Sequence, residues 1–235
     1  MRQEWISIDA AGGDDNGGSY GGYLALPPAG RGPGLLLLQE IFGVNRHIRA
    51  VAEQYALDGF VVLAPDVFWR EAPRVELGYV GAERERAMQL LARADRSKLA
   101  ADLATSIAAL RARPECTGRV GAFGYCMGGR LAYLAAAGGS VDAASCFYGG
   151  GIQDQLEHAV RIECPIQFHY GERDAHIPLA AVDKVKAAFT GRPNAEFHLY
   201  DAEHGFNCWE RAAYHAPSSA RAHARTLALF ARALF

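Results

Sequence analysis

The stretch Gly121–Gly129, GAFGYCMGG, decides the fold expected for this chain. It indicates an apolar strand, a tight turn with Cys126 at its apex, and the start of a helix. The glycines of its G-x-C-x-G pattern allow a sharp turn, because larger side chains would collide with neighbouring backbone. The turn exposes the cysteine and places its sulfur at a helix N-terminus, where the helix dipole favours a thiolate. The pattern therefore predicts that Cys126 is a nucleophile.

Two alternatives compete with this interpretation of Cys126. A lone cysteine is usually a small buried hydrophobe, and we expect that role for Cys116, Cys146 and Cys164. A dinucleotide-binding loop would need G-x-G-x-x-G, and the stretch lacks the first G-x-G. The five cysteines are widely spaced with no C-x-x-C pair, which predicts reduced thiols rather than a disulfide framework or a zinc site.

Outward from this turn, apolar runs alternate with helical patterns along the chain. Strands are expected at 5–10, 20–27, 33–40, 60–66, 119–125, 143–150 and 165–174, and in the first part of 195–205. Helices are expected at 47–59, 127–139, 179–191 and 218–234, and residues 82–113 are expected to be mostly helical. The first two strands should form an antiparallel hairpin across the Gly-rich segment 12–18. The alternation predicts one α/β domain over 1–235, with a mostly parallel central sheet and helices on both faces.

Composition narrows the class of protein further. Half of the 235 residues are hydrophobic, 21% are charged, and the net charge of −2 contains no basic block, so nucleic acid is not an expected partner. The chain starts without an apolar signal region and has no apolar run of membrane-spanning length. We therefore expect a cytoplasmic protein that does not contact a membrane. No phosphate loop or ligand cluster indicates a cofactor or a metal.

Polar groups follow several of the expected strands, where doubly wound folds gather their working residues. They are Gln39-Glu40, Cys126, Asp174 and His204. The last three occur in the order nucleophile, acid, histidine, which suits a triad in which His204 takes the thiol proton and Asp174 fixes its tautomer. His176 is a rival base, but it precedes the last strand and fits that order less well.

Four motifs carry a resemblance to a known family. They are QEIFGVN at 39–45, APDVFWR at 64–70, GYCMGG at 124–129 and AEHGF at 202–206. In this order they resemble the dienelactone hydrolase family of α/β-hydrolase enzymes, over nearly the whole chain. The resemblance implies an α/β-hydrolase fold and a Cys126–His204–Asp174 triad. It also implies hydrolysis of a lactone or ester through a thioester, in the first place dienelactone to maleylacetate, the carboxymethylenebutenolidase reaction.

The resemblance assigns further roles to the loop after the third expected strand. It implies that Glu40 contacts Cys126 in the resting enzyme and shifts when substrate arrives, helping to deprotonate the thiol. The alternative for Glu40 is a solvated loop carboxylate or an ion-pair partner. In this fold the oxyanion donors are the backbone N–H groups after the nucleophile and in the first strand–helix loop, here Met127 and Ile41.

Substrate recognition is where the resemblance weakens. The family holds the substrate carboxylate with two arginines, and one of these matches Arg86, with Arg84 as a possible one-turn alternative. The second position is Cys208, and a thiol cannot make the bidentate bonds of a guanidinium. Either Arg86 acts alone, or Arg211 reaches in, or the substrate differs. Arg84 and Arg86 could equally be a solvated helix face.

Several aromatic residues near the motifs could line a pocket for a flat ligand. They are Phe42, Tyr125, Phe147, Tyr148 and Phe206. The alternative for each of them is a place in the core.

Other functions remain open at this stage. The chain could be an esterase or thioesterase of another small acyl substrate, a non-catalytic binding protein on the same scaffold, or a redox sensor using Cys126. The expected partner is a small lactone or ester, and the chain could be a monomer or a small homo-oligomer.

Overall fold

The computed structural model describes residues 1–10 and 18–235, so most of the turn expected at 12–18 lies outside the described residues. The strands are β1 Arg2–Asp9, β2 Ser19–Leu26, β3 Gly32–Leu38, β4 Val61–Pro65, β5 Cys116–Tyr125, β6 Ala143–Phe147, β7 Ile166–Gly171 and β8 Ala195–Tyr200. The α-helices are α1 Arg46–Leu57, α2 Gly81–Arg93, α3 Arg96–Arg111, α4 Met127–Ala137, α5 Leu179–Ala188 and α6 Ala216–Leu234. Two short 3₁₀ helices are η1 Ile152–Asp154 and η2 Leu156–Arg161.

The eight strands form one sheet in the order β1-β2-β4-β3-β5-β6-β7-β8. β1 and β2 pair antiparallel, and so do β2 and β4. The β3–β4, β5–β6, β6–β7 and β7–β8 pairs are parallel. This confirms the predicted α/β class, the mostly parallel sheet and the N-terminal antiparallel hairpin.

The chain divides into two compact units, residues 1–120 and 121–235. The expectation of a single domain over 1–235 therefore stays a prediction. Each unit has its own buried strands and covering helices. Among the described residues, no helix combines the length and apolar character needed to cross a membrane.

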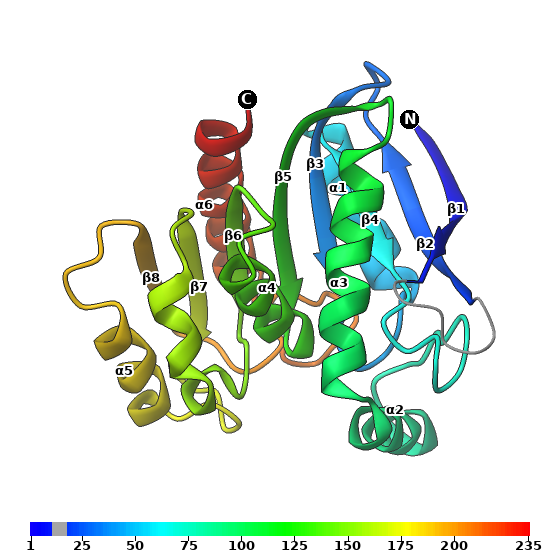
Figure 1. Ribbon diagram of the computed structural model, residues 1–235. Helices are drawn as coiled ribbons and strands as arrows, with labels where there is room; N and C mark the ends of the chain where they lie inside the picture. The colour runs from blue at the N-terminus through cyan, green and yellow to red at the C-terminus, as the bar shows by residue number, and fades with distance from the viewer. Residues whose placement is uncertain (11–17) are drawn as a thin grey trace. The chain divides into compact units, whose positions relative to one another are not determined.

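In the first unit, β3 and β4 are buried along their whole lengths, as continuous apolar runs in a parallel sheet should be. Helix α1 packs on β4 and β2, whereas α3 packs on β3 and β1 from the other face of the sheet (Figure 1). The buried side of α3 carries Leu99, Leu103, Ile107 and Leu110, as their spacing predicted.

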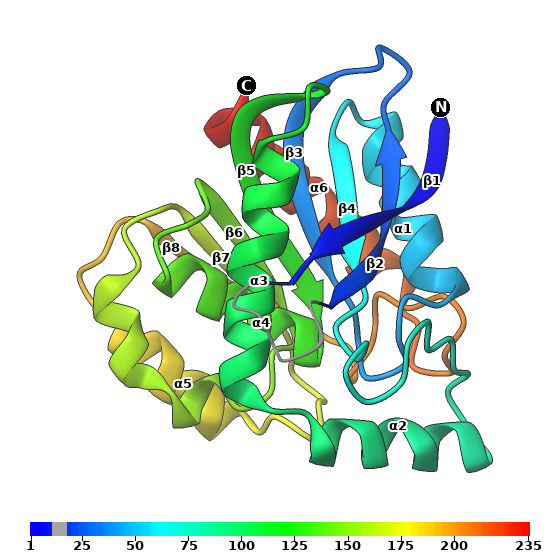
Figure 2. The same ribbon diagram turned by 45° about the vertical axis from the view of Figure 1, so that its right-hand side comes forward.

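In the second unit, β6 and β7 are fully buried between helices. Helix α4 packs on β6 from one face, and α6 packs on β6 and β7 from the opposite face (Figure 2). The carboxyl ends of β5, β6, β7 and β8 lead into the loops that carry Cys126, Tyr148, Asp174 and His204. Because parallel strands end at one edge, this unit brings four functional loops together.

Candidate active site

Cys126 occupies the single residue between β5 and α4. Its backbone has φ 55° and ψ −115°, a conformation that non-glycine residues rarely adopt and that active sites often retain. The Cys126 N–H donates to the Phe147 carbonyl at 3.0 Å, and its own carbonyl accepts from Gly129 N–H at 3.0 Å. The chain thus reverses within one residue, and the half-buried thiol lies at the start of a helix.

Gly129 shows why the turn needs glycines. A Cβ atom at this position would lie 2.4 Å from the Phe147 carbonyl oxygen and 3.2 Å from that of Gly124. Both neighbours are backbone atoms that cannot move aside. The glycine therefore permits the close approach of α4 to the ends of β5 and β6.

Asp174 is held rigidly in the loop after β7. Its Oδ1 accepts hydrogen bonds from the backbone N–H of His176 at 2.8 Å and of Ile177 at 3.1 Å. Its Oδ2 lies 2.7 Å from His204 Nδ1, and the Asp174 side chain is fully buried. The carboxylate is therefore fixed by two amides while its second oxygen faces the imidazole.

His204 connects Asp174 to Cys126. Burial alone would lower the pKa of His204, but hydrogen bonds with Asp174 and Cys126 outweigh it and raise the pKa to about 10. These contacts therefore favour the cationic form of the imidazole. The three side chains that the motif order singled out lie in one chain of contacts within the second unit.

His176, the rival histidine, takes a different place. Its backbone N–H binds Asp174, and its ring lies edge-on to His204 with the centroids 5.0 Å apart. Tyr148 contacts the His204 ring in the same manner, also at 5.0 Å. Both residues form part of the surroundings of the His204 imidazole.

Glu40 and Ile41 lie in the turn after β3 in the first unit, separated from the strand by Gln39. Glu40 is 2% exposed, which does not fit a solvated loop carboxylate, and Ile41 is 8% exposed. At Gly43, with φ +83°, a Cβ would lie only 1.8 Å from the Val75 carbonyl oxygen. The segment around Val75 therefore packs tightly on the turn that follows Glu40. The expected role of Glu40 beside Cys126 and that of Ile41 as an oxyanion donor with Met127 remain predictions.

The arginines expected to bind substrate differ in their surroundings. Arg84 and Arg86 are both exposed on α2. Cys208 is fully buried, so its thiol is part of the core. Arg211 is half-buried, and its guanidinium lies against Gly205, where a Cβ would be 2.3 Å from Nη1. Arg211 therefore lies against the loop of His204.

The aromatic residues form a packed layer. Phe147, Tyr148 and Phe206 are each 0% exposed and Tyr125 is 1% exposed, and the Tyr125–Phe147 and Tyr148–Phe206 ring centroids are 4.8 and 5.3 Å apart. Phe42 is also buried, packing edge-on against Tyr79. These rings belong to the core of their units, and Tyr148 also contacts the His204 ring.

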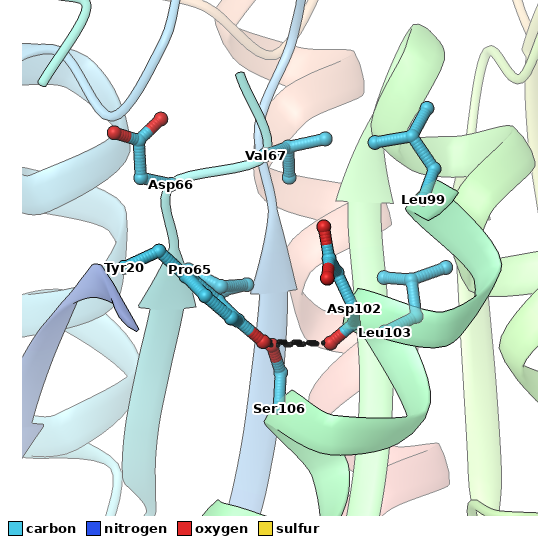
Figure 3. Close-up of a pocket in the computed structure, with 8 residues that line it drawn as sticks. All are labelled: Tyr20, Pro65, Asp66, Val67, Leu99, Asp102, Leu103 and Ser106. Atoms are coloured by element: carbon cyan, nitrogen blue, oxygen red, sulfur yellow. Dashed lines mark hydrogen bonds between the residues drawn. The ribbon is translucent and has the colours of Figure 1, made fainter. Parts of the chain in front are cut away.

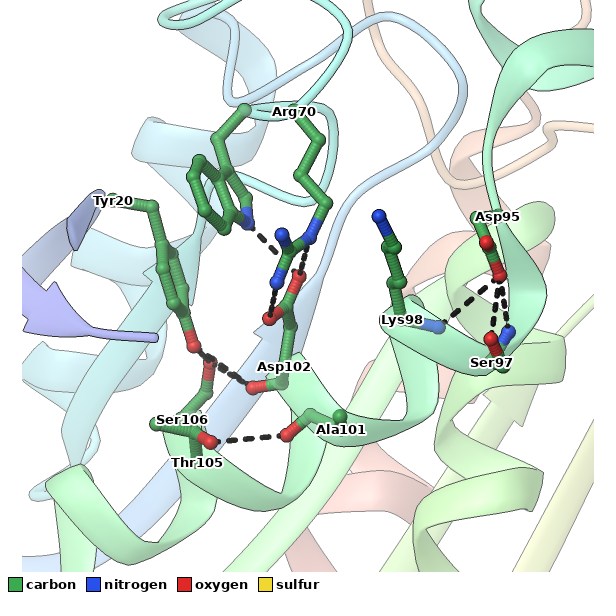
Figure 4. A network of polar contacts seen from close by, with 10 residues as sticks. Tyr20, Arg70, Asp95, Ser97, Lys98, Ala101, Asp102, Thr105 and Ser106 are labelled. Carbon is green, nitrogen blue, oxygen red and sulfur yellow. Dashed lines mark hydrogen bonds and ion pairs between the residues drawn. The ribbon is translucent and has the colours of Figure 1, made fainter. Parts of the chain in front are cut away.

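Sequence reasoning missed a polar cluster in the first unit. Asp102 accepts from Trp69 Nε1 at 2.9 Å and from Arg70 Nε and Nη2 at 3.1 and 2.9 Å (Figure 4). Tyr20 donates to the Asp102 carbonyl at 2.8 Å and contacts Ser106 Oγ at 2.8 Å. The cluster ties the loop after β4 to α3.

A small pocket lies beside this cluster, lined by Asp66, Leu103 and their neighbours (Figure 3). Its volume is about 10 Å³, enough for about one water molecule. Burial raises the pKa of Asp66, even though two backbone N–H groups bind the carboxylate. The pocket contains none of the expected catalytic residues and is too small for a substrate.

The sheet order and the contacts of His204 are those expected of an α/β-hydrolase. Residues 20–234 match the model of the dienelactone hydrolase family, and the chain belongs to that family. Carboxymethylenebutenolidase from a Pseudomonas species is 36% identical over 233 residues, covering 99% of this chain and 96% of the relative. Carboxymethylenebutenolidase from Pseudomonas putida is 33% identical over 229 residues, covering 97% and 95%.

Solved structures agree with this assignment. A Klebsiella pneumoniae protein assigned as a dienelactone hydrolase has a TM-score of 0.84 at 27% identity, covering 98% of this chain and 99% of that one. An esterase from Pyrococcus furiosus, at 16% identity and a TM-score of 0.74, shares the fold, covering 100% of this chain and 94% of that one. The chain is a carboxymethylenebutenolidase-like hydrolase, as the motifs predicted.

Proposed function

We propose that the chain hydrolyses a small lactone or ester by attack of the Cys126 thiolate, in the first place dienelactone to maleylacetate. The observation that carries this proposal is the continuous contact from Cys126 through His204 to the fixed carboxylate of Asp174. The names of the relatives, carboxymethylenebutenolidase, support the substrate.

The first half of the reaction forms a thioester. The Cys126 sulfur attacks the substrate carbonyl, and the resulting oxyanion accepts hydrogen bonds from the backbone N–H groups of Met127 and Ile41. When the ring C–O bond breaks, the His204 imidazolium donates its proton to the departing oxygen. In a lactone this oxygen stays attached to the substrate through the acyl chain.

The second half restores the enzyme. Neutral His204 accepts a proton from water, and the hydroxide oxygen attacks the thioester carbonyl. Collapse of this intermediate breaks the C–S bond, releases the acid and leaves the thiolate beside the imidazolium. Asp174 holds the His204 ring in one orientation throughout, and its negative charge stabilises the cationic form. Glu40 is proposed to keep Cys126 as a neutral thiol before substrate arrives, to accept the thiol proton when substrate binds, and to return that proton after the acid is released. The burial of Glu40 supports a role inside the protein rather than in solvent.

The substrate either carries a carboxylate or is a neutral ester, and the arginines bear on which of the two classes fits. Arg211 beside Gly205 supports a substrate that carries a carboxylate, because a guanidinium pairs with it through two hydrogen bonds. We propose that Arg211 supplies the charge that Cys208 cannot, with Arg86 as a second contact. The exposure of Arg86 and the uncharged Cys208 favour the second candidate, an esterase of neutral acyl substrates.

Steady-state hydrolysis by the purified protein tests this function. The substrates are a carboxylate-bearing lactone, its methyl ester and p-nitrophenyl acetate. Cys126→Ala should abolish turnover of all three, and Cys126→Ser should be much slower than the parent because a hydroxyl needs a stronger base. Mass spectrometry of the quenched parent should show an acyl group on Cys126.

Cys164→Ala is the matched control, because it removes another half-buried thiol outside the cluster. It should keep parent activity. Turnover retained by Cys126→Ala would exclude the proposed nucleophile. A preference for the methyl ester over the free carboxylate would favour the neutral esterase.

A further inference from the structure

A chain of polar side chains crosses the buried interior of the second unit. The exposed Arg225 donates from Nη1 to the Tyr200 hydroxyl at 3.0 Å, and this hydroxyl lies 2.9 Å from His169 Nδ1. His169 Nε2 is 3.2 Å from Thr226 Oγ1, which in turn is 2.9 Å from Ser145 Oγ. This series of hydrogen bonds therefore links β6, β7, β8 and α6.

The sheet register places this series of polar side chains between β7, β8 and α6. His169 pairs with His198 and Gly171 pairs with Tyr200, so these side chains share one face. His169 is 0% exposed and its ring stacks on Phe147 with centroids 4.5 Å apart. Thr226 reaches the imidazole from α6.

The hydrogen-bond directions in this chain follow from its donors. A guanidinium only donates, so the Tyr200 oxygen accepts from Arg225, and its own proton is available for His169 Nδ1, 2.9 Å away, when the ring proton of His169 is on Nε2. His169 Nδ1 is then an acceptor, and the ring proton sits on Nε2, where it is donated to Thr226. A proton on Nδ1 would face the hydroxyl proton of Tyr200.

The surroundings keep His169 neutral. The titratable and charged groups that face it are His198 and Tyr200 on β8 and Arg225 on α6, and Glu196 lies beyond His198 at 3.4 Å. Burial, together with the nearby His198 and Arg225, holds the pKa of His169 well below its usual value.

Tyr200 is also where the two catalytic loops meet. Its carbonyl accepts from the Glu172 N–H at 2.8 Å, and Arg173 N–H donates to the Ala202 carbonyl at 3.0 Å. The Tyr200 ring packs on Phe206, two residues past His204, with centroids 5.1 Å apart. A displacement of Tyr200 therefore reaches both the Asp174 loop and the His204 loop.

We propose that Tyr200 and His169 are positioning residues for His204. The neutral Nε2–H form of His169 accepts from Tyr200 and thereby holds the end of β8 in register with β7. This keeps the His204 imidazole within hydrogen-bonding distance of Asp174. For its effect on turnover the inference rests on the proposed function, but the position of His204 can be measured without substrate.

Tyr200→Phe tests the proposal, because it removes the hydroxyl and keeps the ring that packs on Phe206. Tyr133→Phe is the matched control: Tyr133 is also fully buried in this unit, and its hydroxyl donates to the Gln155 carbonyl at 2.9 Å. Both variants should lower the Tm. In Tyr200→Phe the His204 titration, followed by NMR of ¹⁵N-histidine, should move down from about 10, and in Tyr133→Phe it should not move.

Turnover supplies the second measurement. Tyr200→Phe should lower kcat by about tenfold with little change in KM, because a misplaced base slows proton transfer more than binding. Tyr133→Phe should keep both constants. An unchanged His204 titration in Tyr200→Phe, or an Nδ1–H tautomer of His169 in the parent spectrum, would overturn the inference. If the parent hydrolyses none of the substrates, the proposed function fails, whereas the titration still decides the inference.

Discussion

Two buried aspartates, one in each unit, look alike in the structure and have different consequences. Asp102 and Asp174 are 6% and 5% exposed. Each carboxylate accepts from three donors: Trp69 Nε1 and two Arg70 nitrogens at Asp102, and two backbone amides and His204 at Asp174. Burial and hydrogen-bond satisfaction therefore do not distinguish Asp102 from Asp174, for which we propose a catalytic role.

The donors themselves make the difference. Indole and guanidinium groups keep their protons across the physiological pH range, so the contacts of Asp102 are permanent. At Asp174 the two backbone amides fix the carboxylate, and the third donor is an imidazole that can exchange its proton. A buried aspartate indicates chemistry when one of its partners can titrate and also contacts a further reactive group, as His204 contacts Cys126.

Asp174→Asn should give the largest effect. The amide oxygen of the introduced asparagine can still accept from the backbone N–H groups of His176 and Ile177, but its NH₂ group would face His204 Nδ1 and favour the wrong tautomer. The expected loss in kcat is about 10³–10⁴-fold, by analogy with the corresponding change in serine proteases. Stopped-flow or long-time hydrolysis assays measure it. A kcat close to that of the parent would mean that Asp174, like Asp102, has a structural role only.

Asp102→Asn should give the opposite result. It leaves the Arg70 guanidinium without its carboxylate in a partly buried site, where the arginine and aspartate side chains are 16% and 8% exposed. We expect a loss of about 3 kcal/mol in the free energy of unfolding, measured in urea, because breaking a buried ion pair leaves an uncompensated charge. The kcat should stay near the parent value, and a fall comparable to that of Asp174→Asn would erase the distinction.

The sequence predicts the parts of the site that depend on local pattern and strand order. The turn at Cys126 is predicted by its glycines. Asp174 and His204 come after expected strands, which end at one edge of the sheet. Residues 82–113 are mostly helical, as expected, but the structure divides them into α2 and α3. The reason is Asp95, whose Oδ1 accepts from the backbone N–H of Ser97 and Lys98 and caps α3. An aspartate followed by Arg-Ser-Lys is a start signal that sequence reasoning could have used.

The two polar clusters could not be predicted in this way. Asp102 meets Trp69 and Arg70 across 33 and 32 residues of chain, and His169 meets Tyr200 across 31. Such pairs depend on how strands and helices pack, and neither the period of a strand nor that of a helix encodes them. For the same reason, the sequence left open whether Arg211 approaches the histidine loop.

The smallest expected effect is on the pH dependence of the free energy of unfolding. This effect compares Asp102 and Asp174 most directly. His204 titrates at about 10 in the folded chain and near 6.5 when unfolded, so its contribution to stability is complete below pH 6.5 and is lost as the pH rises through 10. Between these values the free energy of unfolding should fall by up to ~1.4 kcal/mol per pH unit from this group. Asp174→Asn should reduce that slope, because the neutral amide cannot stabilise the imidazolium and only the contribution of Cys126 to the raised pKa remains.

Asp102→Asn should keep the slope, since the guanidinium of Arg70 stays charged throughout this range. Urea unfolding of the parent and both variants at pH 7, 8, 9 and 10 measures the difference, in which the titration of other groups cancels. Equal slopes in the parent and Asp174→Asn would mean that Asp174 does not hold His204 in its cationic form. The two carboxylates would then be alike in stability as well as in burial, and the assignment of Asp174 would depend on turnover alone.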